Sequence, residues 1–375
     1  MVGAMTAAAR TFKGRGATVN PDGRYEAARH EAFDDGWGGD EAPSAPRAEV
    51  LRAEVLRTEV LRTEVLPEAA RSIITRNTSP DIAFDRSINP YRGCEHGCVY
   101  CFARPNHAYV GLSPGLDFET RLFTKPDAAR LLERELAAPG YRPATIALGT
   151  ATDPYQPIER THRLTRQVLE VLARDRHPVG IVTKSNLVTR DIDILSDMAA
   201  MGLVKVAMSV TTLDPALARR MEPRAPHPER RLDAIRQLTA AGIPVLVMVA
   251  PIIPSLNDHD IEAILARARD CGAMEARHVL LRLPLELDDL VGDWLRAHYP
   301  GKKRHVMSLV RQARGGKAYD AAFGRRMTGA GPYAELIAER MRLARKRLGY
   351  RETRVPLRTD LFVRPSRDGA QLSLL

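Results

Sequence analysis

The chain has 375 residues, of which 44% are hydrophobic and 27% are charged, and its formal net charge is +10. The hydrophobic content is enough for a large core, and no apolar run approaches the roughly 18 residues needed to span a bilayer. Because the N-terminal residues also lack the apolar region of a signal peptide, we expect a cytoplasmic protein with no membrane partner.

The positive charge is concentrated in the last fifth of the chain. Residues 301–375 contain 18 Lys and Arg against 6 Asp and Glu, so the first 300 residues are close to neutral. A basic end on a near-neutral body indicates a polyanionic partner, most simply a nucleic acid. The alternative is drift of composition in an arginine-rich chain.

Residues 1–70 are rich in Ala, Gly, Pro and charged residues, and we expect a mostly disordered or extended N-terminal region. Within it lies a pentapeptide repeat at residues 47–66, "RAEVLRAEVLRTEVLRTEVL". A period of five turns the Val-Leu pair by about 140° around a helix at each copy, so no apolar face forms. We interpret the repeat as part of a linker.

From residue 71 onward, short apolar runs alternate with amphipathic segments. The runs predict strands because they are nearly continuous, as expected when helices cover a parallel sheet. The predicted strands lie at residues 145–150, 179–185, 204–212, 244–253 and 277–283. Helical patterns separate them, so repeated β-α units predict a parallel α/β fold, either barrel-like or doubly wound, with ligands at the carboxyl ends of the strands.

Three of the four cysteines, Cys94, Cys98 and Cys101, fall in one short stretch, "NPYRGCEHGCVYCFARP". This spacing does not suit a disulfide framework and indicates metal or redox chemistry. A zinc site would need His96 or His107 as a fourth ligand. An iron–sulfur cluster held by three thiolates would leave one iron without a protein ligand. The fourth cysteine, Cys271, could in principle supply that ligand, but its position at the end of a predicted helix favours a structural role.

The pattern C-x3-C-x-aromatic-C, with Tyr100 before the last cysteine, resembles the radical S-adenosylmethionine (SAM) enzymes. The resemblance implies a 4Fe-4S cluster bound by Cys94, Cys98 and Cys101, with SAM on the open iron. Reductive cleavage of SAM would then yield methionine and a 5′-deoxyadenosyl radical. It also implies a partial (β/α)6 TIM-type barrel over residues 71–300 and an electron donor such as flavodoxin or ferredoxin.

Residues 89–253 resemble the spore photoproduct lyase-like branch of these enzymes, which implies a set of SAM contacts. Tyr100 would lie near the adenine, Thr152 would touch SAM, and Lys184 and Ser209 would bind its carboxylate. Two positions depart from the patterns of these enzymes. The Gly-Gly-Glu motif that holds the SAM amino group elsewhere in the superfamily is absent. Thr150 stands where the lyase has a hydrogen-donating cysteine, so reversal of thymine dimers is not predicted.

Longer strings, among them "SIITRNTSPDIAFDRSINPYRG" and "EPRAPHPERRL", resemble one bacterial family of uncharacterised radical SAM proteins. That resemblance spans nearly the whole chain and assigns no substrate.

The C-terminal part is expected to contain a basic helical extension at residues 301–350 and a flexible basic tail at residues 351–375. The tail ends in "QLSLL", which resembles the pentapeptide by which bacterial repair proteins bind the DNA sliding clamp. The residues concerned are Gln371, Leu372, Ser373, Leu374 and Leu375. Leu375 stands where Phe is usual.

These observations predict a radical SAM enzyme with lyase-like or modifying activity, acting on nucleic acid in DNA repair or base modification. The same radical chemistry on a protein or small molecule is the first alternative. The second is a non-catalytic, metal-stabilised nucleic-acid-binding protein.

Overall fold

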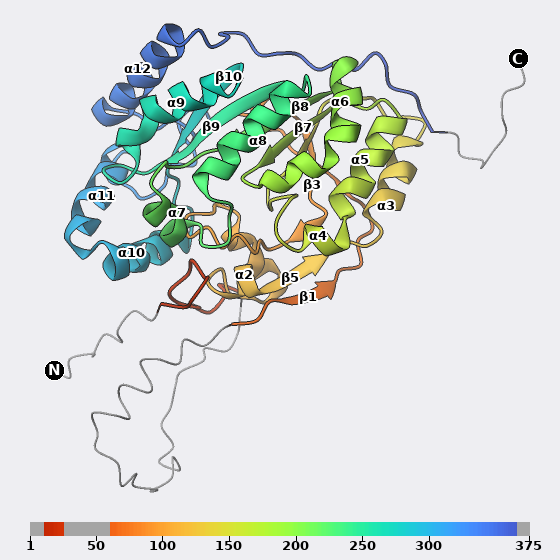
Figure 1. Cartoon of the computed structure of the whole chain (residues 1–375). Helices are drawn as coiled ribbons and strands as arrows, with labels where there is room; N and C mark the ends of the chain where they lie inside the picture. The colour runs from red at the N-terminus through yellow and green to blue at the C-terminus, as the bar shows by residue number, and fades with distance from the viewer. Residues whose placement is uncertain (1–10, 26–60, 366–375) are drawn as a thin grey trace, which may run out of the picture.

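The computed structural model describes residues 11–25 and 61–365 (Figure 1). A seven-stranded sheet with the order β10-β9-β8-β7-β6-β3-β2 forms its centre. The strands are β2 (Ile74–Arg76), β3 (Arg86–Ile88), β6 (Ile146–Leu148), β7 (Val179–Thr183), β8 (Val204–Ser209), β9 (Val245–Ile252) and β10 (Glu275–Leu280). The six strands from β3 to β10 are parallel to their neighbours, and β2 is antiparallel to β3.

The parallel strands follow one another in chain order across the sheet, which remains open, with β2 and β10 at its edges. This arrangement confirms the predicted α/β fold with a partial barrel. We call the assembly the half-barrel, the carboxyl ends of its parallel strands the mouth, and their amino ends the floor.

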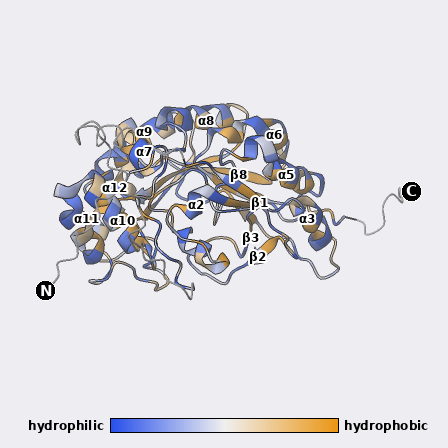
Figure 2. Cartoon of the chain, turned by 90° about the horizontal axis from the view of Figure 1, so that it is seen from below, coloured by the Kyte–Doolittle hydropathy of each residue, from blue (hydrophilic) through white to orange (hydrophobic). Residues whose placement is uncertain are grey.

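Helices connect the strands and cover the outer side of the sheet. They are α3 (Ala128–Leu136), α4 (Glu159–His162), α5 (Leu164–Arg174), α6 (Ile192–Ala200), α7 (Pro215–Met221), α8 (Pro228–Ala240) and α9 (Ile261–Asp270). Figure 2 shows α9, α8, α6 and α5 in an arc along the sheet. In α5, Val168, Leu169 and Leu172 recur at helical spacing and are fully buried against the sheet, so one apolar face fixes the position of the helix.

A second, three-stranded sheet lies beside the mouth, in the order β1-β5-β4 (Figure 1). It consists of β1 (Glu64–Pro67), β4 (Tyr91–Arg92) and β5 (Arg121–Thr124), with α2 (Asp117–Thr120) before β5. The last copy of the pentapeptide repeat supplies β1, which pairs in parallel with β5. The linker interpretation therefore does not hold for this copy, whose backbone completes a sheet edge; residues 47–60 lie outside the described part.

Three helices follow β10: α10 (Leu287–His298), α11 (Pro300–Gln312) and α12 (Pro332–Arg347). Residues 351–365, which we call the strap, run across the floor, although we expected a flexible tail from residue 351. Its backbone N–H groups donate to carbonyl oxygens that precede β10, β8 and β7: Arg351 to Met274, Arg358 to Gly202, and Val363 to Asp175. Residues 366–375, with the pentapeptide, lie outside the described part.

Candidate active site

The three clustered cysteines lie in a loop at the mouth, after β3 and β4. Gly93 and Gly97 have positive φ angles of 75° and 67°, which favour glycine. A Cβ on Gly97 would lie 2.2 Å from the Glu119 carboxylate, and one on Gly16 would lie 1.8 Å from the Gly97 carbonyl oxygen. The glycines therefore let the loop turn back on itself and let the segment 11–25 pack directly on it.

Arg104 holds this loop in place from beneath. Its guanidinium is fully buried and donates to the carbonyl oxygens of Gly97, Cys98, Pro114 and Gly115. It also forms an ion pair of 3.0 Å with the buried Glu119 carboxylate. Glu119 in turn accepts from the backbone of residues 16 and 17. The backbone on both sides of Cys98 is thus fixed by charge-assisted hydrogen bonds.

Cys94 and Cys98 are buried, and Cys101 is partly buried. Burial raises the pKa of all three thiols, and mutual repulsion adds to the rise for Cys94. Arg104, Lys184 and Arg282 oppose the rise at Cys101. Three thiols that influence one another, with cations behind them, suit a soft, positively charged metal group that binds thiolates. An iron–sulfur cluster fits this donor set.

Among the described residues, no group of three or more His, Cys, Asp and Glu side chains is arranged to hold a single metal ion, and the two histidines considered as zinc ligands have other neighbours. His96 faces Asp153 at 3.4 Å, and His107 bonds the carbonyl oxygen of Arg121 at 2.9 Å. Cys271 caps α9 at the floor, where its sulfur accepts from Arg236 at 3.5 Å. It is at the opposite end of the strands from the other three cysteines.

Lys184 and Ser209 reach the mouth from neighbouring strands. Lys184 follows the last residue of β7, and Ser209 ends β8. The Lys184 ammonium is 5.5 Å from the centre of the Tyr100 ring and 3.7 Å from the Glu222 carboxylate. Burial lowers the pKa of Lys184, against the opposing influence of Cys98. The Ser209 hydroxyl forms no hydrogen bond with another residue in the described part.

A buried network that the sequence did not reveal surrounds these groups. The Glu222 carboxylate accepts from Tyr100, Thr211 and Arg231, and all four side chains are buried. Glu222 and Arg231 both lie in "EPRAPHPERRL", but nothing in that string indicates that they form a pair. The network fixes the phenol of Tyr100 and positions an acidic group next to Lys184.

The hydroxyl groups of Thr152 and Thr150 form hydrogen bonds with residues in and next to the cysteine loop. The Thr152 hydroxyl donates to the Gly93 carbonyl oxygen at 2.6 Å and accepts from Gln156 at 2.9 Å. Thr150 is hydrogen-bonded to Asn89 at 3.1 Å. The predicted contact of Thr152 with SAM stays a prediction, because the described hydroxyl is already engaged next to Cys94.

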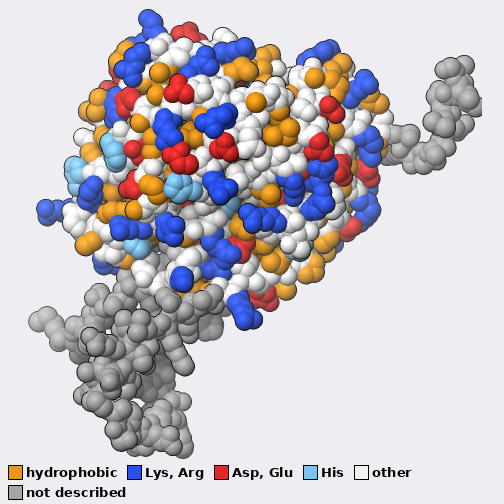
Figure 3. Space-filling model, in the orientation of Figure 1, with side chains coloured by type: hydrophobic (Ala, Val, Ile, Leu, Met, Phe, Trp, Pro, Cys, Tyr) orange, Lys and Arg blue, Asp and Glu red, His pale blue; other side chains and the backbone are white. Residues whose placement is uncertain are grey.

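Ion pairs compensate part of the positive charge of the C-terminal part, residues 301–365. Arg340 pairs with Glu262 at 2.6 Å, Arg326 with Asp81 at 2.5 Å, and Arg358 with Asp360 at 2.6 Å. Figure 3 shows Lys and Arg side chains spread among acidic ones over this face rather than in one continuous patch. Recognition of a polyanion would therefore depend on local groups more than on total charge.

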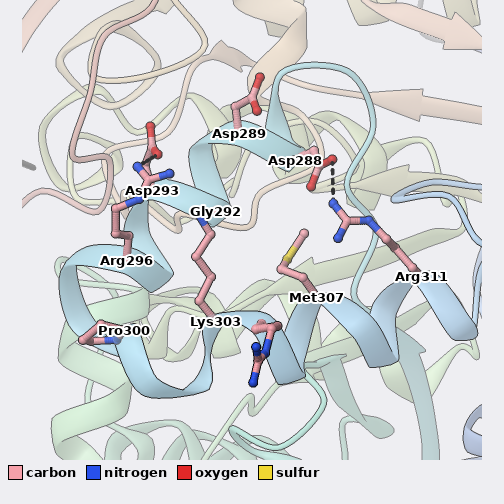
Figure 4. A pocket seen from close by; sticks show the side chains of 10 residues that line it. Asp288, Asp289, Gly292, Asp293, Arg296, Pro300, Lys303, Met307 and Arg311 are labelled. Atoms are coloured by element: carbon pink, nitrogen blue, oxygen red, sulfur yellow. Dashed lines mark hydrogen bonds and ion pairs between the residues drawn. The ribbon is translucent and has the colours of Figure 1, made fainter. Parts of the chain in front are cut away.

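A hollow of about 450 Å³ lies between α10 and α11. Figure 4 shows Lys303 and Met307 reaching into it and Asp288 paired with Arg311, at 3.8 Å. None of the sequence-predicted site residues lines it. Within the described ranges, no helix is long and apolar enough to cross a membrane.

Comparison with family models matches residues 88–268 to the radical SAM superfamily. An uncharacterized protein of Mycobacterium tuberculosis is 42% identical over 177 residues, which are 47% of this chain and 52% of that protein. An uncharacterized protein of Methanocaldococcus jannaschii is 29% identical over 46% of this chain and 61% of its own length. The chain thus spans about half to two thirds of the curated relatives it matches.

Among solved structures, a cysteine-to-serine mutant of spore photoproduct lyase is similar, with a TM-score of 0.55 and 16% identity over 76% of this chain and 79% of that chain. A second mutant, with bound AdoMet and dinucleoside spore photoproduct, gives a TM-score of 0.54 and 15% identity over the same shares. At this identity, the likeness concerns the fold.

Proposed function

We propose that the chain, whose residues 88–268 match the radical SAM superfamily, is an enzyme that cleaves SAM reductively on a 4Fe-4S cluster bound by Cys94, Cys98 and Cys101. When bound, the cluster supplies the electron that breaks the sulfonium bond and releases a 5′-deoxyadenosyl radical. The observation that carries the proposal is that one loop at the mouth holds three thiols, two buried and one partly buried, whose charges influence one another.

The chain's own residues would hold SAM beside that loop. The Lys184 ammonium and the Ser209 hydroxyl come from adjacent strand ends and would bind the SAM carboxylate. Tyr100, fixed by Glu222, would lie along the adenine. Thr152 would act mainly by positioning the Cys94 backbone. Burial of these groups keeps water from the reacting atoms.

The test is anaerobic reconstitution with iron and sulfide, followed by dithionite and SAM. We expect a brown protein with about four irons and four sulfides per chain and formation of 5′-deoxyadenosine. Protein that binds zinc instead, or that carries a cluster but leaves SAM intact, would contradict the proposal and favour the non-catalytic binding protein.

We further propose a nucleic-acid substrate, with DNA repair or base modification as the activity. The basic extension supports this choice, as does the dinucleoside spore photoproduct bound to the lyase mutant that shares this fold. DNA, tRNA and protein fractions would be added to the cleavage assay. Stimulation by a nucleic-acid fraction alone supports the proposal, while stimulation only by protein or small-molecule fractions would favour the alternative substrates.

Two partners are part of the same proposal. Flavodoxin or ferredoxin would supply the electron, and replacement of dithionite by the reduced carrier should sustain SAM cleavage. The DNA sliding clamp would bind residues 371–375. Binding of purified clamp should disappear when these five residues are deleted, and unchanged binding would exclude them as the contact.

A further inference from the structure

An exposed aromatic ring stands next to the cluster loop. Phe102 directly follows Cys101, and its side chain is 49% exposed. The Arg282 guanidinium lies over this ring, with its central carbon 4.3 Å from the ring centre. Proteins commonly bind unpaired nucleobases by stacking them on exposed aromatic rings, and arginine contributes to such sites.

Arg282 is placed there by the chain after β10. Leu281 and Leu283, on either side of it, are buried in the apolar cluster that contains Cys98 and Tyr100. Arg282, between them, is partly exposed, and its guanidinium lies over the Phe102 ring. Because Phe102 directly follows Cys101 and Arg282 lies over the Phe102 ring, the pair lies next to the predicted cluster loop.

The guanidinium of Arg282 forms no hydrogen bond or ion pair with a residue among 11–25 and 61–365, and the nearby carboxylate of Asp81 is already paired with Arg326. Its neighbour Arg326 is bound to Asp81 and Ser79. A second exposed ring, Tyr109, also has an arginine above it, at 5.2 Å, but that residue, Arg24, is paired with Glu286 at 2.7 Å. Arg282 thus differs by keeping its donors for a ligand.

We propose that Phe102 and Arg282 form a platform at the mouth that binds one nucleotide of a single-stranded nucleic acid. The base stacks on the exposed part of the Phe102 ring, and an adjacent phosphate pairs with the Arg282 guanidinium. The inference rests on the proposed function, because it places the substrate beside the cluster. Beyond that function, the inference names Phe102 and Arg282 as the side chains that hold the substrate, and it requires the substrate to be single-stranded where it binds.

The test uses reconstituted full-length protein and a fluorescent single-stranded thymidine 12-mer, with anisotropy measured without oxygen at several salt concentrations. Phe102→Ala should weaken binding about tenfold, since one stacked base contributes about 1–3 kcal/mol, and Phe102→Trp should restore it.

Arg282→Gln should also weaken binding and reduce the salt slope by about one. Tyr109→Ala is the matched control and should bind within about twofold of the wild type.

Iron content and SAM cleavage without substrate are measured on the same samples. They should be unchanged in Phe102→Ala, which separates this inference from the proposed function. Loss of SAM cleavage in the wild type would overturn the function. Wild-type SAM cleavage with no oligonucleotide binding, or with equal binding in all variants, would overturn the platform alone. The platform would also be overturned if Arg282→Gln bound less SAM or iron but bound the oligonucleotide as well as the wild type does.

Discussion

The mouth and the floor of the half-barrel are each covered by a segment from a distant part of the chain. The two ends differ in whether the polar side chains named below have hydrogen-bond or ion-pair partners. At the floor, two pairs of polar side chains satisfy one another: Tyr141 bonds His177 at 2.7 Å, and Lys205 pairs with Glu275 at 2.9 Å. At the mouth, the Ser209 hydroxyl and the Arg282 guanidinium have no such partner in the described part. Paired groups support the fold, and unpaired ones are available for ligands.

The largest difference should come from the cysteines at the two ends. Cys98→Ala should abolish SAM cleavage and reduce the iron–sulfur absorbance to background, because a cluster ligand is lost. Cys271→Ala, at the floor, should retain both. Iron and sulfide analysis together with 5′-deoxyadenosine assays measures this. A Cys98→Ala protein that keeps a full cluster would refute the ligand assignment, and loss of the cluster in Cys271→Ala would refute the comparison.

The next largest effect concerns two buried carboxylates. Glu222→Gln should lower the free energy of unfolding by about 3–5 kcal/mol, because it leaves the Arg231 guanidinium buried without its counter-charge. Glu275→Gln should cost about 1–2 kcal/mol, since the partner Lys205 is partly exposed to solvent. Urea denaturation of both variants measures the costs. If both variants lost the same free energy of unfolding, the buried pair of Glu222 and Arg231 would stabilise the protein no more than the partly exposed pair of Glu275 and Lys205.

Two lysines sharpen the contrast for ligand binding. Lys184→Met should weaken SAM binding about ten- to a hundredfold, the loss of one charge-assisted bond of about 1.5–3 kcal/mol. Lys205→Met, at the floor, should leave SAM affinity unchanged. Because burial lowers the pKa of Lys184, wild-type affinity should fall as the pH rises through that lowered value, and the Lys184→Met variant should lack this step. Isothermal titration of SAM without oxygen, at several pH values, measures both the loss of affinity and its pH dependence. If the affinity of Lys184→Met fell with pH as much as that of the wild type, Lys184 would not be the group that titrates.

The smallest expected effect is the acid sensitivity of the floor. Burial, together with the Arg86 charge, lowers the pKa of His177 from 6.5 to about 4. Between these values the unfolded chain binds more protons, so stability present above pH 6.5 declines as the pH falls toward 4. At pH 5.5 the loss from this group is about 1 kcal/mol. Unfolding curves of the wild type and His177→Phe should diverge in this range, and parallel curves would show that another group titrates.

The sequence predicted those parts of the molecule that depend on local pattern. Apolar runs located five of the six parallel strands, and the cysteine spacing located the loop. Pairings between distant residues left no local signal. Phe102 and Arg282 are 180 positions apart, and even the pair between Glu222, at the end of α7, and Arg231 of α8 left no pattern in the string that contains both. The last repeat copy became a strand because β5 offered an unpaired edge, which no period in the repeat could indicate.

The path of the strap determines how the protein would be oriented on anything that grips the chain beyond it. Phe362 packs edge-on against His177, with ring centres 5.4 Å apart, and Arg364 donates to the Tyr141 carbonyl oxygen at 3.0 Å, so residue 365 leaves from the floor. A ring-shaped protein holding residues 371–375 would therefore pull on the side away from the cysteines. Under the proposed contact, such a tether would attach on the side opposite the cysteine loop.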